Sequence, residues 1–300
     1  MMKRILLASV CLILALEPSV FLAQQKMLDV PYVPTKYPVV DEMLKLAGVQ
    51  KGDVVYDLGC GDGRLVVTAA QRYGARGVGF DIDPERIAES VENATKAGVT
   101  GLVKFHEQDL FTADFREATV MTLYLLTSVN LKLRPKLLRE LKPGTRIVSH
   151  NFGMGEWKAD ASSSVDVEDI SHEVYLWIIP ANISGTWTWT QGKRPVNIEM
   201  TVDQVFQYPT AKARTNGKEI EVKDLSLKGD EVKFVMDLLN EDKLVPMTFE
   251  GKASNNSLTG TIKFSSGGKD VVWEWKAKRN PVTEKPIDVE RVTPRSFSFR

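Results

Sequence analysis

The feature that most constrains this chain is a glycine-rich turn between an apolar run and a helical pattern. Residues 54–64 read Val-Val-Tyr-Asp-Leu-Gly-Cys-Gly-Asp-Gly-Arg. Glycine has no Cβ, so a strand that enters a helix through three closely spaced glycines lets the backbone pass close to a ligand. The spacing is Gly-x-Gly-x-Gly, and Arg64 stands where a dinucleotide pyrophosphate site would need its third glycine. The turn therefore predicts a ligand site of another kind.

Short β-rich runs alternate with helical runs on both sides of this turn. The expected strands are 53–58, 77–81, 103–108, 119–125, 146–151 and 173–179, and the expected helices are 64–72, 84–97 and 131–141. Asp83 before Pro84 is a typical helix start, and Pro143-Gly144 is a typical stop. Alternating strands and helices imply parallel strand pairing. Residues 27–180 are therefore predicted to form an α/β domain with an open, doubly wound sheet.

Three acidic residues lie in or directly after the first three expected strands. Asp57 belongs to the first, while Asp81 and Asp109 lie at the ends of the second and third. A carboxylate at the tip of the second strand can accept hydrogen bonds from both ribose hydroxyls of an adenosine, and the third can accept from the adenine amino group. Because the carboxyl ends of parallel strands meet at one edge, we expect all three acids around one crevice.

This combination of glycine turn and strand-end acids resembles the class I S-adenosylmethionine-dependent methyltransferases. The resemblance covers roughly residues 38–180 and implies a Rossmann-like sheet with S-adenosyl-L-methionine as cofactor. It also implies that residues of the turn and of the strand ends bind this cofactor, namely Asp57, Gly59, Gly61, Asp62, Gly63, Asp81, Ile82, Asp109 and Leu110.

Stretches outside the turn narrow the resemblance. They read Val-Pro-Tyr-Val-Pro-Thr at 30–35, Tyr-Leu-Leu-Thr-Ser-Val-Asn at 124–130, Lys-Leu-Leu-Arg-Glu-Leu-Lys-Pro-Gly-Thr-Arg at 136–146 and Val-Ser-His at 148–150. Together with the turn they are similar to the archaeal broad-specificity protein-lysine methyltransferases. They are also similar to the mitochondrial enzymes that modify lysines of the ATP synthase c-subunit and the adenine nucleotide translocase. The resemblance implies transfer of methyl to a lysine ε-amine of a protein, with Tyr32, Pro34 and Thr35 closing over the cofactor. Asp81 departs from the Glu that relatives often carry, a tolerable change for a ribose-binding carboxylate.

The expected reaction needs a neutral amine more than it needs acid–base groups. Methyl transfer from a sulfonium is an in-line displacement that gains most from positioning. A lysine amine with a pKa of about 10.4 costs roughly 4–5 kcal/mol to deprotonate at pH 7, and a desolvated aromatic channel lowers that cost. Tyr32 and Tyr124 are the candidates to line the channel, and Asn130 or Thr127 could orient the amine. His150 is expected to make structural hydrogen bonds, and we assign no general base.

The pattern changes after residue 180. Residues 183–279 contain eight expected strands, at 183–190, 196–205, 211–215, 218–225, 231–238, 245–253, 257–264 and 271–278. Turn signals such as Asn216-Gly217 and Gly267-Gly268 separate them. Such spacing predicts an all-β antiparallel barrel or sandwich. Four tryptophans lie in its first and last strands, where they either close a core or bind a ligand. Residues 280–300 lack apolar periodicity and are expected to form a flexible tail.

Charge and composition limit the partners. Lys and Arg number 39, as do Asp and Glu, so no net field attracts nucleic acid, and we expect none as partner. Two cysteines and three scattered histidines make a metal site unexpected. The expected partner is a protein with an accessible lysine, and the oligomeric state stays open.

The N-terminus points to export. Lys3-Arg4 precedes an apolar run from Ile5 to Leu16, which predicts a signal peptide or an N-terminal anchor over 1–23. The protein would then be periplasmic, or anchored at the inner membrane and associated with it through the N-terminus. Either location is in tension with a cofactor that is made in the cytosol. Both the β domain and the export-type segment are absent from the minimal enzymes that the chain resembles.

Two alternatives stay open beside the protein-lysine methyltransferase. The first is a methyltransferase of the same fold that acts on a small molecule or a lipid, although such enzymes usually cap the crevice with inserted helices. The second is an exported, non-catalytic protein that binds through its β domain. A protein of this fold without catalytic activity should have lost Gly61, Gly63 or Asp81, and all three are present.

Overall fold

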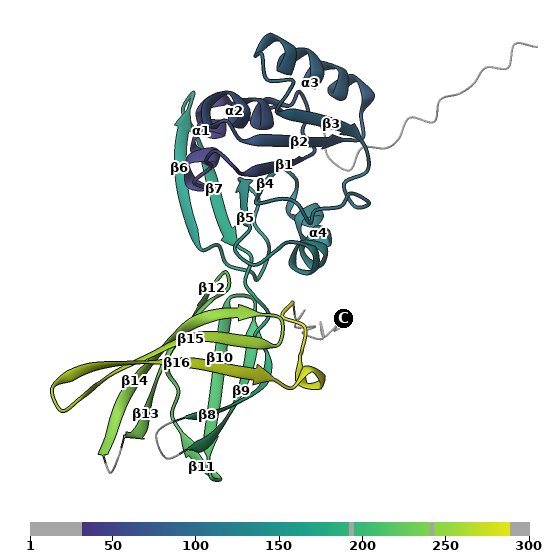
Figure 1. The fold of residues 1–300 in the computed structure, drawn as a ribbon. Helices are drawn as coiled ribbons and strands as arrows, with labels where there is room; N and C mark the ends of the chain where they lie inside the picture. The colour runs from purple at the N-terminus through teal and green to yellow at the C-terminus, as the bar shows by residue number, and fades with distance from the viewer. Residues whose placement is uncertain (1–31, 192–194, 241–242, 289–300) are drawn as a thin grey trace, which may run out of the picture.

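The computed structural model describes residues 32–191, 195–240 and 243–288, which fold into two regions (Figure 1). We call residues 32–180 the α/β domain, residues 181–279 the β domain and residues 280–288 the C-terminal segment. The predicted signal peptide or anchor lies outside the described residues. Within the described part of the chain, no helix is long and apolar enough to cross a membrane.

The α/β domain is built on a seven-stranded sheet in the order β3-β2-β1-β4-β5-β7-β6. The first five strands of that order are parallel, and β7 and β6 are antiparallel additions at one edge. The strands are β1 (Val54–Leu58), β2 (Arg76–Asp81), β3 (Val103–Glu107), β4 (Val120–Leu123), β5 (Arg146–His150), β6 (Ala161–Val167) and β7 (Ile170–Ile178). This arrangement confirms the predicted Rossmann-like methyltransferase sheet.

Four helices accompany this sheet: α1 (Tyr37–Leu46), α2 (Arg64–Tyr73), α3 (Pro84–Lys96) and α4 (Thr127–Glu140). Asp83 caps α3 as expected, because its carboxylate accepts a hydrogen bond from the Glu85 backbone nitrogen at 2.9 Å. The prediction was incomplete at three places. Helix α4 begins at Thr127 rather than 131, and the predictions contained neither α1 nor β6.

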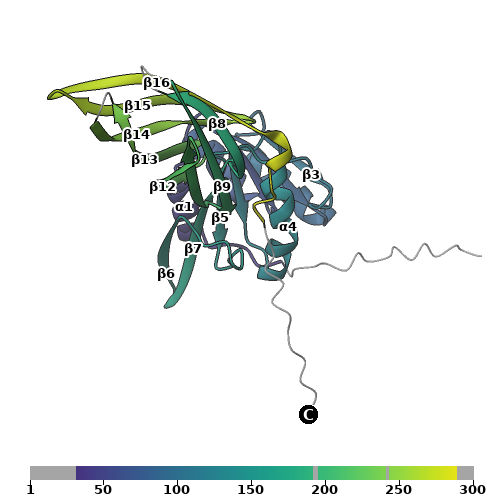
Figure 2. The same cartoon turned by 90° about the horizontal axis from the view of Figure 1, so that it is seen from below.

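The β domain is one antiparallel sheet of nine strands in the order β11-β10-β9-β8-β16-β15-β14-β13-β12. It lies below the α/β domain in Figure 1, and the view from below shows its curvature (Figure 2). The strands are β8 (Gly185–Gln191), β9 (Val196–Val205), β10 (Tyr208–Thr215), β11 (Lys218–Ile220), β12 (Lys223–Lys228), β13 (Glu231–Asn240), β14 (Lys243–Ser254), β15 (Ser257–Ser266) and β16 (Lys269–Arg279). A single curled sheet is a half-barrel, which decides the predicted choice of barrel or sandwich in favour of the barrel.

The strand order shows where the two edges of the half-barrel lie. The two edge strands β11 and β12 are consecutive in the chain and are separated by residues 221–222 alone. The expected single strand 218–225 is therefore split, because its first part pairs with β10 and its second with β13. Among the described residues, strand β16 pairs with β8 at two positions only, Lys278 with Thr188 and Arg279 with Trp187.

Strict alternation places the apolar residues of the β domain in one core. Along β9, Ile198, Met200 and Val202 are buried while the residues between them are exposed. Trp189 and Trp275 pack edge-to-face with ring centroids 5.8 Å apart. With the buried Trp187 they belong to the core, so the interpretation of the tryptophans as core residues is confirmed for these three.

One turn of the β domain inserts into the core of the α/β domain. Phe206, between β9 and β10, is 1 % exposed and stacks on Trp157 with ring centroids 5.7 Å apart. The Trp157 indole N–H donates to Gln207 Oε1 at 2.8 Å. The Arg134 guanidinium of α4 lies 5.2 Å from the Phe206 ring centroid. The two domains therefore share a packed interface.

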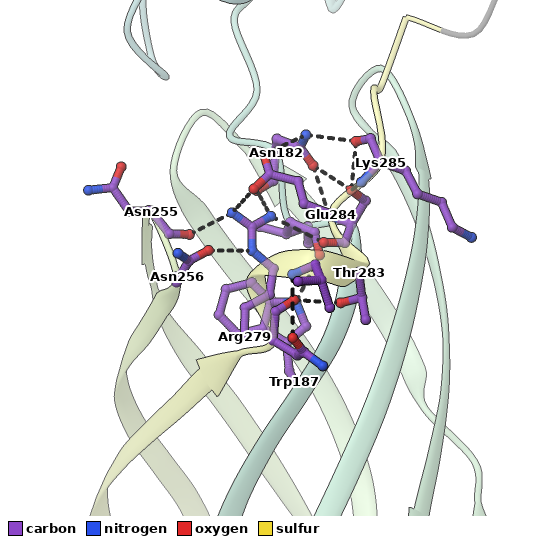
Figure 3. A network of polar contacts seen from close by, with 12 residues as sticks. Asn182, Trp187, Asn255, Asn256, Arg279, Thr283, Glu284 and Lys285 are labelled. Carbon is purple, nitrogen blue, oxygen red and sulfur yellow. Dashed lines mark hydrogen bonds and ion pairs between the residues drawn. The ribbon is translucent and has the colours of Figure 1, made fainter.

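The C-terminal segment continues this interface, contrary to the prediction of a flexible tail from residue 280. Its short 3₁₀ helix η1 (Pro281–Thr283) follows β16, and the Lys285 carbonyl accepts hydrogen bonds from Asn182 and Ser184 (Figure 3). Farther on, Asp288 pairs with Arg134 of α4 at 2.8 Å. The prediction rested on missing periodicity, and such a segment can still be held by polar contacts. Residues 289–300 lie outside the described part of the chain.

Arg279 anchors the start of the C-terminal segment. Its guanidinium donates to the Asn182, Ser184 and Asn255 carbonyls and pairs with Glu284 at 2.7 Å (Figure 3). Burial of this cation lowers its pKa from the ordinary arginine value. The many acceptors compensate for its desolvation, as a buried charge requires.

Candidate active site

The glycine turn adopts the backbone that its sequence predicts. Gly59, Gly61 and Gly63 have φ angles of +73°, +53° and +74°, in the left-handed region that favours glycine. A Cβ at Gly61 would come within 2.4 Å of the Tyr32 ring. The turn is therefore closely covered by the segment of residues 32–35, which we call the N-terminal strap.

Asp81 at the end of β2 is fixed by the glycine turn. Its Oδ2 accepts a hydrogen bond from the Gly61 backbone nitrogen at 2.9 Å, and its Oδ1 accepts one from the Asp83 nitrogen at 3.0 Å. Each carboxylate oxygen has a second lone pair for a ligand. Asp81 lines the cleft between the turn and the strap. Its position at the tip of the second strand is the one expected for a ribose-binding acid.

Asp57 in β1 is the buried acid of the site. Its Oδ1 accepts a hydrogen bond from the Thr122 hydroxyl of β4 at 2.6 Å. Desolvation raises its pKa to about 7, against the hydrogen bond from Thr122, and the negative charges of Asp81 and Asp62 add to the rise. A cationic ligand beside Asp57 would favour its ionised form.

The N-terminal strap is held over the turn by two arginines. The Arg64 guanidinium donates to the Thr35 carbonyl at 2.7 Å and to both carboxylate oxygens of Asp62, at 2.8 and 2.6 Å. The Arg86 guanidinium lies 4.6 Å from the Tyr32 ring centroid. Tyr32 itself is 41 % exposed. The strap is thus tied to the two elements that begin after β1 and β2.

Strap, turn and strand ends surround one cleft of about 1070 Å³, including its open mouth. Of the predicted site residues, twelve line it: Tyr32, Pro34, Thr35, Asp57, Gly59, Gly61, Asp62, Asp81, Ile82, Asp109, Leu110 and Tyr124. Among the described residues, the lining holds five aspartates but only two basic side chains, Arg64 and Arg86. Because S-adenosylmethionine carries a sulfonium and an ammonium against one carboxylate, this acidic surplus fits it.

Two predicted site residues do not line the cleft. Gly63 faces inward, where a Cβ would come within 2.7 Å of the Phe105 ring. Its role is to let α2 begin close to the sheet. Asn130 is fully buried in α4, and its amide nitrogen donates to the Phe152 and Gly153 carbonyls at 3.2 and 3.3 Å. Its amide nitrogen therefore holds the loop after β5, and the orientation of the acceptor amine by Asn130 stays a prediction.

Tyr124 lies at the end of β4 and stacks on a histidine. Its ring centroid is 3.9 Å from that of His150, which is 1 % exposed at the end of β5. Desolvation raises the pKa of Tyr124, so its hydroxyl stays protonated at neutral pH. His150 makes two hydrogen bonds at this strand end, with Thr35 Oγ1 at 3.3 Å and His172 Nδ1 at 2.9 Å.

Sequence reasoning missed several residues that shape the cleft. Arg64 was noted only because it interrupts a glycine pattern, and Arg86 and Thr122 not at all. Their roles depend on partners 29 to 65 residues away in the sequence, which no local pattern reports. Cys60 of the glycine turn is a buried, free thiol whose pKa is raised by desolvation.

Comparison with known proteins identifies the family. The model of the ANTKMT methyltransferase domain matches residues 57–161. A protein-lysine N-methyltransferase of Saccharolobus islandicus is 48 % identical over 151 residues, which are 50 % of this chain and 94 % of that protein. The adenine nucleotide translocase lysine N-methyltransferase of Mus musculus is 34 % identical over 131 residues, which are 44 % of this chain and 57 % of that enzyme. The chain thus spans little more than half the length of this mouse relative.

A solved structure matches the same share of the chain. It is an RNA methyltransferase from Salinibacter ruber in complex with S-adenosyl-L-homocysteine, 56 % identical, and the match covers 50 % of this chain and 96 % of that one with a TM-score of 0.47. The archaeal relative is matched over almost its entire length at 48 % identity. The chain therefore belongs to the protein-lysine N-methyltransferase family and is an S-adenosylmethionine-dependent methyltransferase.

Proposed function

We propose that the protein transfers a methyl group to the ε-amine of a lysine in a protein acceptor. The observation that carries this proposal is the acidic cleft in which strap, glycine turn and Tyr124 meet. Half of the chain, including this cleft, matches a protein-lysine N-methyltransferase over 94 % of that relative's length. When bound, S-adenosylmethionine supplies the methyl group.

Each part of the cleft has a task in this proposal. Asp81 would hold the ribose hydroxyls and Asp109 the adenine amine, and Asp57 would stabilise the positive charge of the cofactor. Gly59 and Gly61 let the backbone approach the cofactor, while the strap covers it. Tyr32 and Tyr124 would line the acceptor channel with apolar ring surface, which disfavours an ammonium and so favours the neutral amine that attacks.

A large acceptor fits the surface better than a small one. The strap residues Tyr32 and Val33 are 41 % and 56 % exposed, and Leu126 at the start of α4 is 38 % exposed. These apolar side chains lie near the cleft and would contact a protruding peptide segment. A formal charge of zero gives no net field to attract an RNA backbone.

The proposal is tested by identifying the labelled product. The purified protein is incubated with methyl-labelled S-adenosylmethionine and a cell extract, and the proteins are hydrolysed to amino acids. Label in methyl-lysine is expected. Acetylation of the extract lysines beforehand should abolish it, and Asp81→Asn is the control for cofactor dependence. Label in RNA, in lipid or in a small metabolite would overturn the proposal and identify the alternative.

We also propose that residues 1–23 direct the protein to or across the inner membrane. The support is the Lys3-Arg4 start and the apolar run that follows. Cell fractionation and N-terminal sequencing of the isolated protein test this. Recovery of the full-length chain in the soluble cytosolic fraction would contradict it and would remove the tension with cofactor supply.

A further inference from the structure

The strap, β5 and β7 bring together a chain of proton-carrying groups that starts in the cleft. Thr35 is buried and lines the cleft. Its hydroxyl lies 3.3 Å from Nδ1 of His150, and Nε2 of His150 lies 2.9 Å from Nδ1 of His172. His150 is 1 % exposed, whereas His172 is only partly buried. The contacts therefore lead from the cleft, through a buried imidazole, toward the surface.

We propose that Thr35, His150 and His172 form a relay that carries a proton from the acceptor ammonium to solvent. This inference rests on the proposed lysine acceptor and adds the step that produces the neutral amine. His150 and His172 act on the amine through Thr35, as positioning residues that pass the proton on. Neither forms a bond to the methyl group.

The transfer balances without a co-reactant. The ammonium N–H bond breaks and its proton goes to the Thr35 oxygen, as the hydroxyl proton of Thr35 moves to Nδ1 of His150. Nε2 of His150 gives its proton to Nδ1 of His172, and the resulting imidazolium releases its Nε2 proton to water. The amine keeps the electron pair with which it attacks. No group is oxidised or reduced.

The surroundings of His150 suit a relay better than a proton store. Desolvation and, to a smaller extent, the neighbouring His172 together lower its pKa to about 4. At pH 7 the buried ring is therefore neutral and can accept a proton at one nitrogen only while it gives one up at the other. The rings of Tyr124 and His172 lie 3.9 and 5.0 Å from its own.

The strap and the neighbouring elements α1, β5, β6 and β7 also carry other ionisable groups. They are Lys36 beside the strap, Tyr37, Asp41, Glu42 and Lys45 of α1, Asp166 of β6, Glu168 in the β6–β7 turn, Glu173 and Tyr175 of β7, and Arg146 of β5. Lys36 and Glu168 form an ion pair at 3.4 Å. Asp41 pairs with Arg72, and Glu42 with Lys45.

The test compares pH–rate profiles of the full chain and of His172→Gln on a lysine acceptor. Glutamine fills similar space but cannot pass a proton through a ring. We expect a loss in kcat of about 100-fold at pH 7, in the usual range for a positioned proton carrier. The loss should shrink as the pH approaches 10, where the free amine needs no relay. Added imidazole should restore part of the activity at pH 7.

The controls separate a relay from a structural role. Ser171→Ala alters the exposed neighbour of His172, whose hydroxyl contacts only Ser164 in the described contacts, and it should keep the wild-type profile. Titration with S-adenosylhomocysteine should give the same dissociation constant for His172→Gln as for the wild type. Histidine NMR is a readout independent of activity. With only three histidines in the chain, it should show the His150 ring neutral from pH 6 to 9.

Two results would overturn the relay. One is a His172→Gln profile that runs parallel to the wild-type profile at every pH. The other is a His150 ring that NMR finds protonated at neutral pH. If His172→Gln fails to fold, the same profile is measured for Thr35→Val, which removes the hydroxyl and keeps the shape. An inactive wild type on lysine acceptors would instead refute the proposed function, so the two failures are distinguishable.

Discussion

The two domains place their polar side chains in opposite ways. In the α/β domain, the acids in or after β1, β2 and β3 converge on one cleft together with Tyr124 and the N-terminal strap. In the β domain, polar residues alternate with apolar ones along the strands, so that along β9 every second side chain faces solvent. Polar groups that converge on one cleft indicate a binding or catalytic site, whereas polar residues that alternate with apolar ones indicate a strand with one buried face. The comparison teaches that the catalytic task lies in the α/β domain and that the β domain acts through its interface or its surface.

The strongest challenge to this division is the turn that crosses it. Phe206 belongs to the β domain by sequence and to the core of the α/β domain by packing. Phe206→Ala should lower the free energy of unfolding by about 3–5 kcal/mol, the usual cost of removing a buried aromatic ring. In scanning calorimetry, the transition of the α/β domain should move to lower temperature.

The matched control is Val205→Ala at the neighbouring position, where the side chain is 37 % exposed. This substitution should change the unfolding free energy by less than about 0.5 kcal/mol. If Phe206→Ala moved only the transition of the β domain, the shared interface would contribute nothing to the α/β domain, and the two would be independent units.

A second prediction concerns the cofactor site alone. Asp81→Ala should weaken S-adenosylmethionine binding by about 100-fold or more, because two hydrogen bonds to a charged group are lost at about 1.5–3 kcal/mol each. Calorimetric titration of the protein with S-adenosylmethionine measures this change in affinity. Asp114→Ala, at an exposed acid that pairs only with Arg116 among the described contacts, should leave binding unchanged. Unaltered affinity in Asp81→Ala would refute the assignment of the cleft.

How well the sequence predicted these features depends on the range of the interaction. Asp57, Asp81 and Asp109 could be placed at one edge because strand ends are local signals and parallel pairing aligns them. Helix α1 carried a signal that was overlooked, since Val39, Val40, Met43 and Leu44 have helical spacing and are all buried. Strand β6 is mostly polar and exposed, and only its pairing with β7 makes it a strand.

The remaining features depend on contacts between distant residues. Nothing near Phe206 shows that a turn residue enters another domain. Nothing near Arg64 shows that it fixes the Thr35 carbonyl. The C-terminal segment looked like a tail because its order comes from Arg279, Asn182 and Arg134 rather than from a repeating pattern. Local periodicity therefore predicted elements and strand-end acids, but not the contacts that join them.

A smaller effect is expected from pH. The raised pKa of Asp57, about 7, means that the folded protein binds this proton more tightly than the unfolded chain does. Its contribution to stability is therefore present at low pH and is lost as the pH rises through about 7. A cationic cofactor favours the ionised carboxylate. As the pH increases toward 7, the affinity for S-adenosylmethionine should therefore increase by up to about tenfold per pH unit, and above pH 7 it should level off.

Titrations between pH 5.5 and 8.5 check this dependence. Asp57→Asn should bind more weakly at pH 8 and should lose most of the slope. Asp41→Asn alters an exposed acid of α1 outside the cleft, and this variant should keep the wild-type dependence of affinity on pH. A wild-type affinity that stays constant across this range would show that Asp57 is not coupled to the cofactor charge.

The smallest expected effect would sharpen the comparison most. Leu239 and Leu244 face each other across β13 and β14 and are 64 % and 68 % exposed, outside the core. The double substitution Leu239→Ser, Leu244→Ser should change the unfolding free energy by less than about 0.5 kcal/mol, since surface substitutions usually do. Methylation of a short lysine peptide should also be unchanged, because the pair lies outside the cleft lining. If methylation of a whole protein acceptor fell while the peptide rate and the stability stayed constant, the β domain would have a recruiting surface, and the division into a catalytic and a merely structural domain would fail.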